Sequence, residues 1–155
     1  MSTAVALVPI AEVERPELRA MMRDYFVELA SYDPDSEDPD EHLERSWPEM
    51  LADMLGRELQ WIVADAQRAG FLIVRTLPDW PHTDRLIASV VEFYIAPEFR
   101  RGGIGSAAVE TMLAEHRDRG TYFVEADILI ANEPAKEFWQ RLGFQVQFLQ
   151  TGRKP

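Results

Sequence analysis

The chain has 155 residues, of which 46% are hydrophobic and 28% are charged, and its formal net charge is −11. This length and composition predict one soluble globular domain over residues 1–155. The acidic balance argues against nucleic acid or an anionic membrane as a partner, because both require a basic surface. Cysteine is absent, which excludes disulfides, thiolate metal ligands and a cysteine nucleophile and favours a cytoplasmic location. No apolar run approaches the ~18 residues of a membrane span, and no basic stretch precedes the first apolar run, so we expect neither a membrane anchor nor a secretory signal.

Hydrophobic periodicity and turn residues predict the following elements in chain order. We expect a strand over 3–10, helices over 16–32 and 43–55, and strands over 59–66 and 71–77 joined as a hairpin by the turn 67–70. A loop over 78–85 then precedes a strand over 86–95, a helix over 103–119, a strand over 122–130, a helix over 134–142 and a last strand over 144–149. The strand–helix–strand unit from 86 to 130 is a crossover that makes two parallel neighbours, whereas the earlier strands form a meander. The predicted class is therefore α/β with a mixed sheet.

The turn between the long strand and the helix that follows it is rich in glycine and arginine. It reads Arg100-Arg101-Gly102-Gly103-Ile104-Gly105-Ser106. Its glycines let the backbone approach a ligand closely, and it lies where the unpaired N–H groups of a helix start meet the positive end of the helix dipole. Such a turn favours a bound anion, most naturally a phosphate or pyrophosphate.

A dinucleotide-binding turn is a rival interpretation of the same glycines, with Glu125 or Asp127 near the position of its ribose-binding acid. Two features argue against it. Residues 96–102 separate the strand from the first glycine of that fingerprint, and fewer than 30 residues follow Asp127, too few for the remaining elements of that fold. A purely structural loop is the other alternative.

A second motif follows about thirty residues later. It reads Asn132-Glu133-Pro134-Ala135-Lys136-Glu137-Phe138-Trp139-Gln140-Arg141-Leu142-Gly143-Phe144. Together with the spacing Arg100-x-x-Gly103-x-Gly105 after a strand, it resembles the GNAT superfamily of N-acetyltransferases over roughly 90–144. The resemblance implies a GNAT-like mixed central sheet of about six strands flanked by about four helices, with acetyl-coenzyme A as acyl donor. Members usually carry a seventh strand, and only eleven residues follow Phe144, so either that strand is missing or a partner chain completes the edge, as in a homodimer.

The resemblance also implies catalytic roles. Glu92, inside an otherwise apolar strand, is the candidate general base, and enclosure would raise its pKa from about 4.3 towards neutrality. The alternative is that strand alternation leaves Glu92 on a solvated or ion-paired face. Trp139 stands where the family commonly has a tyrosine that protonates the departing thiolate, and indole is no practical acid. Trp139 would then shape the coenzyme tunnel, with Tyr94 or water as the acid.

Coenzyme binding is implied for the end of the long strand, the glycine turn and the start of the last helix. The residues are Ile95, Arg100, Arg101, Gly102, Gly103, Ile104, Gly105, Ser106, Asn132, Lys136 and Trp139. For Asn132 a helix cap is an equal alternative to contact with the pantetheine arm, and for Lys136 the alternative is a solvated side chain. The three histidines are scattered without metal-ligand spacing, so we expect no metal.

The predicted function is transfer of an acetyl group from acetyl-coenzyme A to a primary amine, by direct attack in a ternary complex. The alternative is a catalytically inactive acyl-coenzyme-A-binding sensor or interaction module, which Trp139 favours. The acceptor would be a small-molecule or peptide amine. Seven of the twelve residues over 33–44 are acidic, which predicts attraction of a cationic acceptor, with a solvated acidic loop as the alternative.

Overall fold

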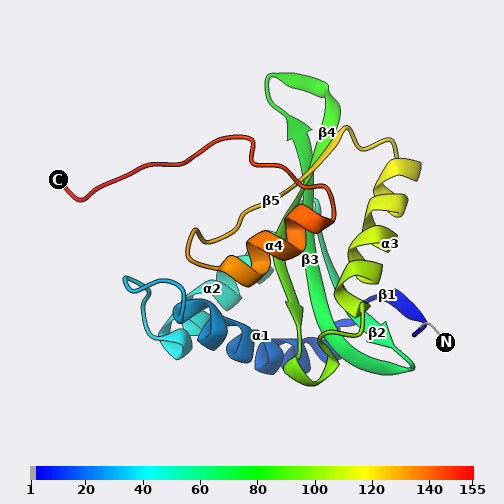
Figure 1. Ribbon diagram of the computed structural model, residues 1–155, viewed down its shortest axis with the longest axis horizontal. Coiled ribbons are helices and arrows are strands. Elements are labelled where there is room, and N and C mark those ends of the chain that lie inside the picture. The colour runs from blue at the N-terminus through cyan, green and yellow to red at the C-terminus, as the bar shows by residue number, and fades with distance from the viewer. Residues whose placement is uncertain (1–2) are drawn as a thin grey trace.

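The computed structural model describes residues 3–155 and has the expected α/β class (Figure 1). Within those residues the sheet has five strands: β1 (Val5–Pro9), β2 (Arg57–Ala64), β3 (Gln67–Asp79), β4 (His82–Ile95) and β5 (Phe123–Ala126). The helices are α1 (Arg15–Ala30), α2 (Pro39–Ala52), α3 (Ile104–Asp118) and α4 (Glu133–Arg141). The strands follow chain order across the sheet, antiparallel from β1 to β4 and parallel between β4 and β5. The predicted mixed sheet with a crossover through α3 is confirmed.

Helices cover both faces of the sheet, and each face has its own apolar core. α1 and α2 cover one face, where Leu18 and Phe71 are fully buried. α3 and α4 cover the other face, where Leu72, Val109 and Trp139 are buried. β3 contributes to both cores because successive side chains of a strand point to opposite faces. The sheet therefore separates two compartments, one under each pair of helices.

α2 begins four residues earlier than predicted because its first turn is capped. The Asp38 Oδ1 accepts hydrogen bonds from the backbone N–H groups of Asp40, at 3.0 Å, and Glu41, at 3.2 Å. Pro39 occupies the first helical position, where its missing N–H group costs nothing. Part of the acidic stretch is thus helix.

The loop predicted over 78–85 is wrong, because β3 and β4 continue through it as a long hairpin. Asp79 pairs with His82 at the tip of this hairpin. The Arg85 Nε donates to Asp79 Oδ2 at 2.6 Å, which links the two strands through their side chains. Proline and charged residues dominate the sequence here because the projecting hairpin has little core to face, so its alternation carries no hydrophobic signal.

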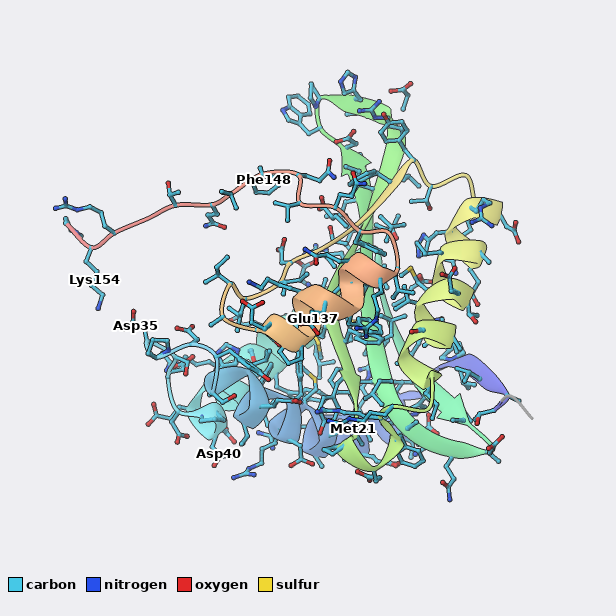
Figure 2. All side chains as sticks on the ribbon, in the orientation of Figure 1. Met21, Asp35, Asp40, Glu137, Phe148 and Lys154 are labelled. Carbon is cyan, nitrogen blue, oxygen red and sulfur yellow. The ribbon has the colours of Figure 1, made fainter. Side chains whose placement is uncertain are left out.

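The strand predicted over 144–149 is also wrong. Residues 145–155 are extended and exposed and pair with no described strand; the exposed fractions are 72% for Val146 and 73% for Phe148. Figure 2 shows Phe148 and Lys154 on this segment, away from the helices. β5 covers only part of the predicted 122–130 and is the edge of the sheet, so the sheet has five strands where about six were expected. No helix within residues 3–155 is long and apolar enough to cross a membrane.

Candidate active site

A β-bulge in β4 decides which face of the sheet Glu92 occupies. Val90 pairs with Val74 and Glu92 pairs with Ile73, so Val91 is an extra residue between the two pairs. Val90 belongs to the core under α3, and simple alternation would send Glu92 to that same face. The extra residue sends Glu92 instead to the face covered by α1 and α2.

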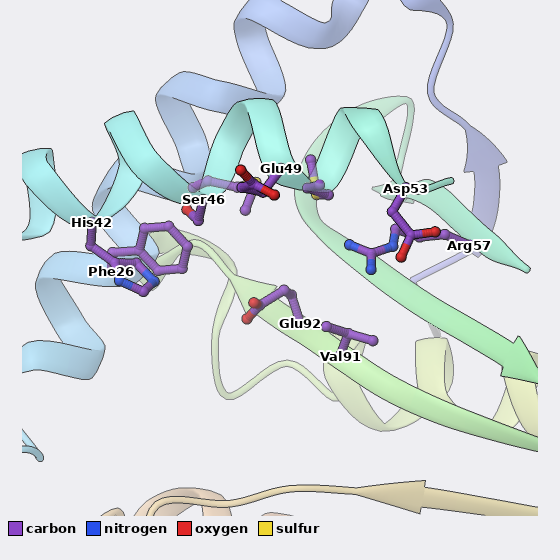
Figure 3. A pocket seen from close by; sticks show the side chains of 10 residues that line it. Phe26, His42, Ser46, Glu49, Asp53, Arg57, Val91 and Glu92 are labelled. Atoms are coloured by element: carbon purple, nitrogen blue, oxygen red, sulfur yellow. The ribbon is translucent and has the colours of Figure 1, made fainter. Parts of the chain in front are cut away.

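Glu92 lines a cavity of about 340 Å³ between β4 and the helices α1 and α2 (Figure 3). Burial raises the pKa of Glu92 from 4.5 to about 7, and the Tyr25 hydroxyl, His42 and Arg57 oppose that rise in part. A carboxylate with a pKa near 7 is suited to accept a proton at neutral pH. The enclosure expected for a general base is present, and the catalytic role of Glu92 stays a prediction.

Tyr94, the candidate acid, lies on the same face as Glu92. It is 6% exposed, and its ring packs against those of Tyr25 and Phe71, with centroids 5.7 and 5.8 Å away. Burial is the largest cause that raises the pKa of Tyr94, so its hydroxyl keeps its proton at neutral pH. The structure therefore gives Tyr94 both a core-packing role and a retained proton.

β4 and β5 separate beyond Val90. Their parallel pairing extends from Ile87 opposite Phe123 to Val90 opposite Ala126, whereas β4 continues to Ile95. Within the described chain, the stretch 91–95 has no strand partner on its β5 side. An extended ligand can form backbone hydrogen bonds at such an unpaired strand edge.

The turn before α3 leaves backbone N–H groups open to a ligand. Gly103 caps the helix with a left-handed φ of 78°, and α3 has neither a side-chain cap nor an acidic residue in its first turn. The first four N–H groups of a helix lack intrahelical acceptors, and here Ala107 N is the donor to Gly103 O at 3.0 Å. A Cβ at Gly102 or Gly103 would meet no atom within 4 Å. The open turn, at the positive end of the helix dipole, fits the phosphate site predicted for 100–106.

The two arginines of this turn differ in their contacts. Arg100 donates from both Nη atoms to the Glu28 carboxylate at 2.7 Å and from Nε to the Ile95 carbonyl oxygen at 2.7 Å. Arg101 is exposed, has a left-handed φ of 66°, and forms no ion pair within residues 3–155. Arg100 therefore holds the turn against α1, and Arg101 is the arginine free to reach a phosphate.

Gly105 allows α4 to pack on the start of α3. A Cβ at Gly105 would lie 3.2 Å from Phe138 and 3.5 Å from Ile95. Beside this contact Trp139 is 5% exposed, with its ring centroid 5.4 Å from that of Phe93. Trp139 is thus part of a buried aromatic cluster with Phe93, Phe138 and Phe144, and its role in shaping a coenzyme tunnel stays a prediction.

Asn132 and Lys136 lie at the start of α4. The Asn132 Oδ1 accepts from Ala135 N at 3.2 Å, so Asn132 caps the helix. The Lys136 Nζ lies 2.6 Å from Glu133. The helix cap that the sequence offered as an alternative for Asn132 is present, whereas Lys136 is ion-paired and not simply solvated. Coenzyme contacts of both residues stay predictions, as do those of Ile104 and Ser106 in the first turn of α3.

The acidic stretch 33–44 is largely engaged in structural contacts. Besides the capping Asp38, Asp40 pairs with Arg23 and Glu44 pairs with Arg19, each at 2.7 Å, and Glu37 contacts Arg45 and His42. Figure 2 shows Asp35 and Asp40 at this end of the molecule. These contacts account for much of the charge, so the predicted attraction of a cationic acceptor rests on few free carboxylates.

Sequence reasoning missed the residues of α2, its C-cap and β2 that line the cavity with Glu92. They are His42, Ser46, Glu49, Met50, Asp53 and Arg57. Most of these positions are three or four residues apart, which places them on one side of a helix. That spacing could have shown that the residues of α2 share one face of a helix. No pattern in the sequence could have placed Arg57 beside them, because its position in the cavity depends on tertiary packing. Residues 3–155 hold no group of three His, Asp or Glu side chains arranged for a metal ion.

The open turn before α3 and the gap between β4 and β5 lie on one side of β4, and the cavity that Glu92 lines lies on the other, which is an arrangement suited to an acyl-coenzyme-A-dependent transferase. The chain matches the model of the Acetyltransferase (GNAT) family over residues 16–144. It therefore belongs to this family, whose acyl donor is acetyl-coenzyme A. An uncharacterized N-acetyltransferase of Methanocaldococcus jannaschii is 36% identical over 61 residues, which cover 39% of this chain and 27% of that protein. The match thus spans about a quarter of that relative's length.

Solved structures share the fold over nearly the whole chain. An unconfirmed acetyl transferase of Pyrococcus furiosus has a TM-score of 0.78 at 15% identity and covers 99% of this chain and 100% of its own. A ribosomal-protein-alanine N-acetyltransferase of Brucella melitensis has a TM-score of 0.71 at 16% identity, with 99% of both chains covered. An aminoglycoside acetyltransferase from an uncultured soil sample has a TM-score of 0.67 at 21% identity and covers 100% of this chain and 99% of its own. The last two are named for different acceptors, so the shared fold does not define the acceptor.

Proposed function

We propose that the protein transfers the acetyl group of acetyl-coenzyme A to a primary amine by direct attack in a ternary complex. The observation that carries this proposal is the position of Glu92, a carboxylate with a pKa of about 7 that faces a cavity of acceptor size. The same strand opens towards α3 on its β5 side, where the acyl donor is expected. Donor and acceptor would then meet across β4.

Acetyl-coenzyme A supplies an activated acetyl thioester when it is bound. The N–H groups at the start of α3, together with Arg101, bind and orient its pyrophosphate. Unpaired N–H groups of β4 beyond Val90 polarise the carbonyl oxygen. Glu92 accepts the proton that the amine loses, directly or through a water, while the new C–N bond forms and the C–S bond breaks.

The departing thiolate needs little help, because a thiol pKa near 8.5 makes it a tolerable leaving group. Tyr94 or water supplies the proton, and Trp139 contributes packing and an indole N–H donor. The alternative of an inactive coenzyme-binding module rests on Trp139 alone. The enclosed carboxylate of Glu92 favours the enzyme.

The test is acetylation by the purified protein of a panel of amines, amino acids and peptides, followed by thiol release and by mass spectrometry of the product. Acetylated amine from the wild type, with turnover of Glu92→Gln lower by about 10²–10⁴-fold at unchanged coenzyme affinity, would support the proposal. Thiol release without acetylated amine, or near-normal turnover of Glu92→Gln at neutral pH, would contradict the role given to Glu92.

A further inference from the structure

Arg57, at the start of β2, has a guanidinium group without a counterion. Its Nε is buried with no hydrogen-bond partner, and the group forms no ion pair within residues 3–155. Arg75, directly opposite on β3, differs: it donates to Asp53 at 2.8 Å and to the Leu55 carbonyl oxygen at 3.1 Å. A partly buried cation without a partner costs folding free energy. An unpaired guanidinium beside a cavity is therefore a group with which an anionic ligand would form an ion pair.

The guanidinium of Arg57 and the carboxylate of Glu92 project into the same cavity from β2 and β4 (Figure 3). They form no ion pair, yet Arg57 lowers the pKa of Glu92 by its charge, so the two groups are near one another without neutralising each other. The Ser46 Oγ, on α2, also lines the cavity and is buried without a partner. Of four such side-chain atoms within residues 3–155, two therefore belong to this cavity. Both are donors that a carboxylate can satisfy.

The remaining lining of the cavity limits what else the ligand can be. Met22, Met50 and Val91 make part of the wall apolar, whereas Glu49 supplies an exposed carboxylate near which an ammonium group is favoured. Asp53 also lines the cavity but already pairs with an arginine outside it. The volume of about 340 Å³ is at the lower end of the ~300–1,000 Å³ range of ligand pockets, which favours a small molecule.

We propose that the acceptor is a small apolar amino acid, whose carboxylate binds Arg57 while its amine faces Glu92. This inference rests on the acetyl transfer proposed above and names its substrate class. The planar guanidinium forms two parallel hydrogen bonds with a carboxylate, which fixes the orientation of the bound molecule. Ser46 adds a further donor, and the apolar side chain contacts the methionines of the wall.

The test compares leucine and methionine with their amides, because the amide removes the negative charge and keeps the amine and the side chain. Arg57→Met should lower kcat/KM about 10- to 100-fold for the two acids, mainly through KM, and less than about threefold for the amides. Arg85→Met is the control, since Arg85 pairs with Asp79 on the β3–β4 hairpin and neither residue lines the cavity. Its ratio of acid to amide kcat/KM should equal that of the wild type.

Isocaproate, the amine-free analogue of leucine, measures carboxylate binding without transfer and without a variant. It should inhibit competitively against the acceptor and raise the melting temperature of the wild type, whereas isocaproamide should do neither. Equal losses for acids and amides in Arg57→Met, or no difference between isocaproate and isocaproamide on the wild type, would overturn the carboxylate site while leaving acetyl transfer intact. Binding of isocaproate without transfer to any amine would instead overturn the proposed function and support the site.

Discussion

Replacing Glu92 by glutamine should make the folded protein more stable at alkaline pH while it removes activity. Burial raises the pKa of Glu92 from 4.5 to about 7, so folding favours the protonated carboxyl and opposes the ionised one. Below the unfolded pKa of 4.5 the group is protonated in both states and no penalty exists. The penalty grows as the pH rises and is complete above about pH 7, where it corresponds to about 3 kcal/mol of unfolding free energy. This is an upper value because cavity water screens part of the charge.

Urea unfolding of the wild type and of Glu92→Gln, each at pH 5 and pH 8, measures this penalty. The stability gained by the glutamine variant should be larger at pH 8 than at pH 5, by up to about 2.5 kcal/mol. The comparison with the wild type cancels the other titrating groups. Glu110→Gln, an exposed carboxylate on α3, is the control and should show no such change. A gain for Glu92→Gln that is equal at both pH values would refute the reasoning.

The kcat/KM of acetyl transfer should fall below about pH 7, because protonated Glu92 cannot accept a proton. Initial rates of Glu92→Gln over the same pH range should not show this fall. Gly103→Val should weaken acetyl-coenzyme A binding about tenfold or more in calorimetry, since it strains a left-handed residue and fills the open space over the turn. Gly105→Val should mainly lower the melting temperature, because its side chain meets Phe138, so unchanged thermal stability would contradict that packing. If a partner chain completes the sheet edge through the exposed segment 145–155, its removal should convert that dimer into a monomer in light scattering without lowering the melting temperature. A monomeric wild type would favour the other alternative, a missing strand.

Local signals predicted the turn and the helix start over 100–106 well. The glycines and arginines over 100–106 predict a turn and a helix start from their own chemistry, and α3 begins one residue after the expected position. Arg100 shows the limit of such reasoning, because its partner Glu28 is distant in the sequence. Phe148 shows a second limit: its segment has the alternation of a strand, but a strand also needs a neighbour for its backbone hydrogen bonds.

The cavity beside Glu92 could be predicted less well because residues of four elements, α1, α2, β2 and β4, line it. The sequence identified Glu92 as a candidate base, but alternation could not give its face, since the bulge at Val91 exists only in the pairing with β3. Arg57 lies 35 positions before Glu92 in the chain, and no motif links the two. The pairing of β2 and β4 on either side of β3 brings them together, and α2 covers the cavity that they share.

Because of the bulge at Val91, the number of residues in β4 matters as much as their identity. Before Val91, the even-numbered residues Ala88 and Val90 point into the core under α3. After Val91, the odd-numbered residue Phe93 points into that core. Loss of one residue here would exchange the two faces of the strand end, placing Glu92 in the apolar core under α3 and Phe93 in the cavity under α2. Single-residue deletions in this strand should therefore be far more damaging than most substitutions. The chemistry of the site depends on the number of residues in β4 as well as on their side chains.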